Sequence, residues 1–105
     1  MASGKFWAGT LSENTNQDTG AVPTNLVRTV SINMVNTGSA VAMARVYVST
    51  SASPTDADRI EPNISIPAGG LYKLTGEVVG AGERVVLFAD AATVTARVSG
   101  FEETA

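Results

Sequence analysis

The sequence predicts an all-β fold, and three observations support this prediction. Segments in which apolar and polar residues alternate recur along the chain, as half-buried strands require. Clusters rich in Gly, Asn, Ser and Pro separate these segments at short intervals. No segment has the apolar periodicity of a long helix. About seven or eight short antiparallel strands in 105 residues predict one compact β-sandwich, either immunoglobulin-like or jelly-roll-like.

The first part of the chain, residues 1–26, is predicted to hold a strand and a polar loop. Phe6 and Trp7 fall on opposite faces of an alternating segment, as in a strand. Residues 12–20 (SENTNQDTG) are polar and rich in turn formers, which is typical of an exposed loop. We therefore describe 1–26 as an N-terminal strand, a polar loop and a candidate binding arm. Residues 27–105 are then the sandwich core of the same single domain.

Two further strands are predicted at 27–35 and 41–49. Apolar and polar residues alternate through the whole of the first strand. The cluster Asn36-Thr37-Gly38-Ser39 lies between the two strands, and its Asn and Gly tolerate positive φ. The two strands are therefore predicted to pair as a hairpin.

The strand at 41–49 is apolar on both faces, and this leaves two interpretations open. Val41, Met43 and Tyr47 share one face, with Arg45 among them. In the first interpretation the strand is central and lies under a loop or a second sheet. In the second, the face of Val41, Met43 and Tyr47 contacts another subunit, since exposed apolar patches mark interfaces.

The second half of the chain is predicted to hold one helical turn and four strands. Thr55 and Asp58 have the spacing of an N-capping turn, which predicts a short helical turn near 55–59. The register of the strand that begins at Leu71 stays open, because Tyr72 and Leu74 fall on opposite faces only if a bulge intervenes. The last two strands are predicted to form a hairpin-like pair. The four strands are 63–66, 71–75, 84–89 and 93–100.

The composition argues against catalysis. The chain has no His and no Cys, which removes the usual nucleophilic triads and zinc sites. Asp56, Asp58 and Glu61 are close in sequence, but their spacing does not match a calcium-binding EF-hand loop. We therefore expect a protein that is not an enzyme, with no catalytic, cofactor-binding or metal-binding residues.

Charge and hydropathy argue against two classes of partner. Lys and Arg are few and scattered and the net charge is −3, so the chain lacks the basic patch of a nucleic-acid-binding protein. No apolar run is long enough to span a membrane, and the N-terminus lacks the apolar stretch of a secretory signal. The absence of Cys fits synthesis in a reducing cytosol. We expect neither nucleic acid nor membrane as a partner.

Three stretches combine turn and strand-end motifs in a characteristic order. They are VSINMVNTGSA, VYVSTSASPTDADRIEPNISIPAGGLYKLTG and GERVVLFADAATVTARVSGFEE. This order resembles that of small virion structural proteins of tailed bacteriophages, and the resemblance covers Arg28 to Glu103. It implies a capsid decoration or cement protein, made in the host cytoplasm and placed on the outer surface of the virion capsid.

The resemblance also suggests partners. It implies binding to the major capsid protein and self-association as a dimer or trimer on the particle. Two alternatives stay open: a tail, neck or fibre component of the virion, and a β-sandwich adhesion module that binds carbohydrate. The candidate interface consists of large apolar residues near the chain ends and on the strand at 41–49, which is apolar on both faces. These residues are Phe6, Trp7, Val41, Met43, Tyr47 and Phe101.

Overall fold

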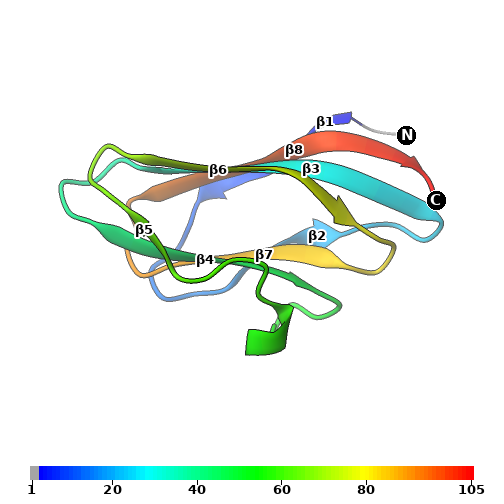
Figure 1. The fold of residues 1–105 in the computed structure, drawn as a ribbon, viewed down its shortest axis with the longest axis horizontal. Helices are drawn as coiled ribbons and strands as arrows, with labels where there is room; N and C mark the ends of the chain where they lie inside the picture. The colour runs from blue at the N-terminus through cyan, green and yellow to red at the C-terminus, as the bar shows by residue number, and fades with distance from the viewer. Residues whose placement is uncertain (1–2) are drawn as a thin grey trace.

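The chain folds into two antiparallel four-stranded sheets that pack face to face (Figure 1). The computed structural model describes residues 3–105. Among these residues no helix is long and apolar enough to cross a membrane. A 3₁₀ turn, η1 (Asp56–Asp58), follows the fourth strand, which confirms both the all-β sandwich and the helical turn near 55–59. The strands are β1 (Ser3–Thr10), β2 (Gln17–Ala21), β3 (Leu26–Asn36), β4 (Ala42–Ser49), β5 (Ile64–Ile66), β6 (Leu71–Val79), β7 (Arg84–Ala89) and β8 (Val94–Thr104).

The strand order is that of a jelly roll. One sheet has the order β1-β8-β3-β6 and the other β2-β7-β4-β5. The antiparallel pairs are therefore nested: β1 with β8, β2 with β7, β3 with β6 and β4 with β5. The chain resembles one long hairpin that has been rolled up so that successive strands fall in opposite sheets. Of the two sandwich types predicted, the structure has the eight-stranded double-sheet jelly roll.

Both predicted hairpins are wrong. β3 and β4 lie in different sheets, as do β7 and β8. β3 instead pairs with β8, from Leu26 opposite Thr104 to Asn36 opposite Val94. The turn after β3 does not close a hairpin, because it is bonded to the connection between β7 and β8. The Thr37 amide and hydroxyl both donate to the Thr93 carbonyl at 2.9 Å. Alternation and turn residues look the same in sequence whether a turn stays within a sheet or crosses to another.

The core lies between the sheets and is built from the inward positions of every long strand. Ile32 and Met34 of β3 and Val46 of β4 are fully buried. Alanine occupies two inward positions of β4 and one of β8, so small residues alternate with large ones across the interior. Interiors reach their density by such interdigitation, and this explains the high Ala and Val content.

The N-terminal strand carries a bulge that changes the facing of its aromatic residues. The register of β1 against β8 shifts between Lys5 and Trp7, so Phe6 is the extra residue. Phe6 and Trp7 both pack against the core, rather than on opposite faces as the alternation predicted. Leu11 and Val22 are also buried, so the sandwich includes residues on both sides of the predicted 26/27 division. The role of 1–26 as a binding arm stays a prediction.

Part of the predicted loop at 12–20 is a strand. β2 forms the edge of the second sheet and buries only Thr19, whose hydroxyl donates to the Val85 carbonyl at 2.7 Å. The segment lacks apolar alternation because its remaining side chains lie at or near the surface. This explains why the sequence pattern did not predict the strand.

A second bulge fixes the register of β6. The pairing with β3 shifts between Leu74 and Glu77, and Gly76 has a φ of +78°. Glycine adopts this conformation without strain. Val79 consequently points into the core, whereas Val78 points to solvent.

Three crossover turns meet at Asn36, a buried polar residue at an inward position of β3. Its side-chain amide donates to the carbonyls of Ala40 (2.7 Å) and Ile66 (3.0 Å). Its side-chain oxygen accepts from the Gly38 amide (3.0 Å) and the Thr93 hydroxyl (2.9 Å). One side chain thereby ties together the β3–β4, β5–β6 and β7–β8 connections.

Candidate functional site

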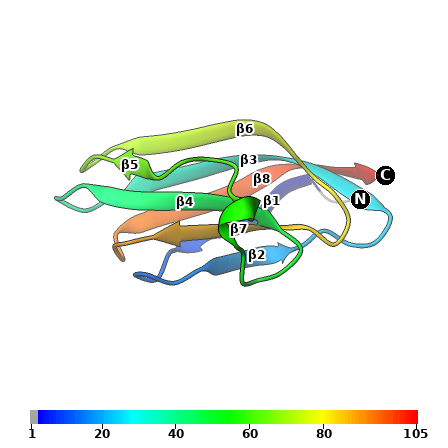
Figure 2. The same cartoon turned by 60° about the horizontal axis from the view of Figure 1, so that its bottom comes forward.

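The two outer faces of the sandwich differ in what covers them. The loop between β4 and β5, with η1, lies over the outer face of the β2-β7-β4-β5 sheet (Figures 1 and 2). The outer face of the β1-β8-β3-β6 sheet has no segment of residues 3–105 across it (Figure 1). We call this second surface the open face. It consists of the outward side chains of β1, β8, β3 and β6.

The loop between β4 and β5 explains why β4 is apolar on its outer face as well as on its inner face. Tyr47 of β4 is only 5% exposed, because the loop pairs with the strand through an isolated bridge between Tyr47 and Arg59. The Arg59 guanidinium lies 5.9 Å from the centre of the Tyr47 ring, and Arg45 stacks 4.8 Å from the ring centre of Phe88. The first interpretation, a strand under a loop, therefore holds for Tyr47.

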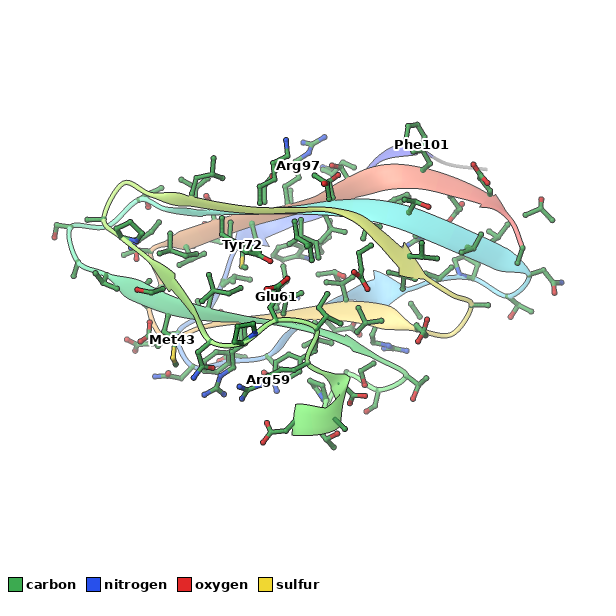
Figure 3. All side chains as sticks on the ribbon, in the orientation of Figure 1. Met43, Arg59, Glu61, Tyr72, Arg97 and Phe101 are labelled. Atoms are coloured by element: carbon green, nitrogen blue, oxygen red, sulfur yellow. The ribbon has the colours of Figure 1, made fainter. Side chains whose placement is uncertain are left out.

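The open face exposes large apolar side chains. Among the described residues, four of the five exposed large apolar side chains lie on it: Phe101 (66% exposed), Leu71 (63%), Val78 (61%) and Val35 (37%). Phe101 and Val78 flank Thr29 in one cross-strand row, and Leu71 lies opposite Val35 in another. Phe101 and Arg97 project from this face into solvent (Figure 3). Exposed apolar side chains gathered on one side of a small protein indicate a contact surface.

The six candidate interface residues do not form one surface. Phe6 and Trp7 face the interior from β1, and Phe101 lies on the open face. Val41, which directly precedes β4, is 62% exposed, and Met43, the second residue of β4, is half-buried; both belong to the side of the other sheet. Met43 lies on the opposite side of the sandwich from Phe101 (Figure 3). Their assignment to an interface stays a prediction.

Leu71 and Val78 are open-face residues that the sequence prediction missed. Simple alternation along β6 would place Val78 on the same side as the half-buried Tyr72 and Leu74. The bulge reverses this facing. The available signal was Gly76, because an isolated Gly inside a strand pattern indicates a bulge.

Polar residues between the sheets form a second candidate site. Tyr72 and Glu61 point toward one another at the side of the sandwich where β5 and β6 lie (Figure 3). Burial raises the pKa of Tyr72 to about 12, and the carboxylates of Glu61 and Glu77 act in the same direction. At neutral pH the hydroxyl is therefore a neutral group and not a base. Within residues 3–105 no group of three or more carboxylates is placed to hold a metal ion.

A small cavity lies between the sheets near the start of β3. It is lined mainly by valines, together with Phe6, Thr19 and Arg28. Arg28 pairs with Glu102 at 2.9 Å and stacks 4.2 Å from the centre of the Phe6 ring. The cavity holds about one water molecule, far less than the several hundred Å³ of a typical ligand site. It is not a sugar-binding pocket.

No family model and no curated protein matches the chain. One solved structure, a pentameric capsid protein isolated from metagenomic phage sequences, aligns with 96% of this chain at 15% identity and a TM-score of 0.44. A second structure of the same description aligns with 97% at 18% identity and a TM-score of 0.40. This chain spans 62% and 65% of the length of those two chains.

Proposed function

We propose that this chain is a structural protein of a bacteriophage virion. The observation that carries the proposal is the open face, a sheet surface that exposes four large apolar side chains. Such a surface suits contact with another protein. The eight-stranded jelly roll is a fold that viral capsid domains use, and the motifs between Arg28 and Glu103 resemble those of phage virion proteins.

Within this class, the proposed role is that of a decoration protein. It would bind the major capsid protein on the outer surface of the shell and stabilise the particle by bridging neighbouring subunits. The role requires contact and no chemistry. A repeated lattice allows many modest contacts to act together wherever the geometry permits simultaneous engagement.

Two other functions compete with this role. A tail, neck or fibre component would use the same kind of contact surface at a different place in the virion. A carbohydrate-binding module is a second use of the jelly roll, since lectin domains share the fold. Here Trp7 and Tyr72 pack between the sheets and Tyr47 is covered by a loop, so these rings do not form an exposed stacking platform.

The location and copy number of the chain in particles test the proposal. Particles produced from the genome that carries this sequence are purified and imaged by electron microscopy, and their proteins are quantified. Density that repeats over the whole shell supports a decoration protein. A single ring of copies at one vertex would instead assign the chain to the tail or neck. Absence from purified particles would overturn the virion proposal altogether.

A further inference from the structure

Among the described residues 3–105, the Lys and Arg side chains without an ion pair, hydrogen bond or ring contact all lie on the open face. Of the seven Lys and Arg residues in the chain, four are engaged: Arg28, Arg59 and Arg84 in ion pairs, and Arg45 in a hydrogen bond to Asn63 and a stack on Phe88. The other three are Lys5, Lys73 and Arg97, all exposed. Their register positions place them on the outward sides of β1, β6 and β8.

The open face is therefore positive in a protein whose net charge is −3. Lys73 and Arg97 flank Asn33 in the row at the middle of the face. Of the ten acidic residues, only Glu103 has an outward position on this sheet. A two-fold contact centred on this row would bring the cations against their own copies, which like-charge repulsion disfavours.

A complementary surface exists on the opposite side of the same molecule. Glu13 and Asp90 are both exposed, and Glu13 forms a β-bridge with Ala89, the residue before Asp90. Asp90 is held firmly, since its carboxylate accepts from the Met43 amide at 2.8 Å and its own amide donates to the Met43 carbonyl at 2.9 Å. The exposed Val41 lies two residues before Met43. We call Glu13, Val41, Met43 and Asp90 the acidic corner.

The acidic corner matches the open face in chemistry. Two carboxylates beside two apolar side chains would meet cations beside apolar side chains. Met43 of the corner belongs to β4 in the β2-β7-β4-β5 sheet, and it lies on the opposite side of the sandwich from Arg97 and Phe101 of the open face (Figure 3). One molecule cannot satisfy both surfaces by itself, but a second copy can.

We propose that copies of this chain associate head to tail, with the open face of one copy seated on the acidic corner of the next. Such a heterologous contact builds a ring if its rotation closes and an open filament if it does not. It does not give an isolated two-fold dimer. The inference goes beyond the proposed function, because it concerns the purified chain and does not require a virus particle.

Sedimentation velocity on purified protein at increasing concentration, at low and at high salt, tests the contact. The wild-type chain is expected to assemble beyond a dimer, and to assemble less at high salt because part of the attraction is ionic. Arg97→Glu and Glu13→Lys are each expected to weaken association about tenfold or more. Asp56→Lys is the matched control for Glu13→Lys, since it makes the same charge change at an exposed residue of the η1 loop. Far-UV circular dichroism verifies that each variant is folded.

The decisive samples are an equimolar mixture of Arg97→Glu and Glu13→Lys, and the double variant. In both samples a newly acidic face can meet a newly basic corner, so assembly is expected to return. A wild-type chain that stays monomeric at millimolar concentration would overturn the inference. So would unchanged assembly of either single variant, or failure of both the mixture and the double variant to assemble. A monomer that is still found across the shell would refute this contact alone, whereas an assembling chain absent from particles would refute the virion role alone.

Discussion

Replacement of Asn36 by Ala is expected to be among the most destabilising single changes in this protein. The side chain is fully buried and makes four hydrogen bonds of 2.7–3.0 Å to three separate crossover turns. A net contribution of about 1 kcal/mol for each of the four hydrogen bonds gives a loss of about 3–5 kcal/mol. For a domain of this size such a loss lowers the melting temperature by roughly 15–20 °C.

Urea denaturation followed by circular dichroism measures this loss as a change in the free energy of unfolding at constant m-value. Asn33→Ala is the matched control, since Asn33 has an outward position on the same strand and its buried side-chain oxygen has no hydrogen bond to lose. The control is expected to change stability by about 0.5 kcal/mol or less. Asn36→Asp separates hydrogen bonding from volume, because it keeps the shape but cannot donate to the two carbonyls. Equal losses for Asn36→Ala and Asn33→Ala would refute the role of Asn36 as the clamp of the three turns.

Three further outcomes are expected. Gly100→Ala should destabilise the domain by more than about 2 kcal/mol, because φ is +151° and a Cβ would collide with the Thr29 carbonyl; a variant as stable as wild type in urea would contradict this. Tyr72→Phe should remove a fall in the free energy of unfolding between pH 10 and pH 12. The pKa of Tyr72 is 10 in the unfolded state and about 12 in the folded state, so the unfolded state loses its proton first and is favoured as the pH rises through this range. Denaturation at pH 9 and pH 11 measures that fall, and an equal fall in the Phe variant would exclude Tyr72 as its source. Arg28→Gln should cost about 2–3 kcal/mol, because it removes both the ion pair with the nearly buried Glu102 carboxylate and the stack on Phe6; an unchanged melting temperature would show that these two contacts contribute nothing.

The strands themselves follow closely from sequence, because their inward residues are apolar at every second position. β3 illustrates this agreement: the prediction of 27–35 differs from the observed Leu26–Asn36 by one residue at each end. The helical turn near 55–59 was likewise predictable, since Thr55 and Asp58 interact locally and the Thr55 amide donates to the Asp58 carboxylate at 2.9 Å.

The candidate site was less predictable, because its residues acquire their environments from distant parts of the chain. Tyr47 and Met43 share a strand face in sequence, yet a loop that begins after Ser49 covers Tyr47. Phe6 and Trp7 alternate in sequence, yet a bulge turns both toward the core. Lys73 and Arg97 are 24 residues apart, and only the pairing of both strands with β3 places them on either side of Asn33.

The sequence by itself determined the class of fold, the positions of most strands and turns, and the absence of His and Cys chemistry. These properties depend on local periodicity and residue type. Only the tertiary structure decided that the predicted hairpins cross between sheets, that Asn36 joins three turns, and that the unpaired cations gather on one open face. The physical reason is that nested pairing brings together residues as distant as Ser3 and Phe101, and neither periodicity nor turn chemistry encodes which strand lies beside which.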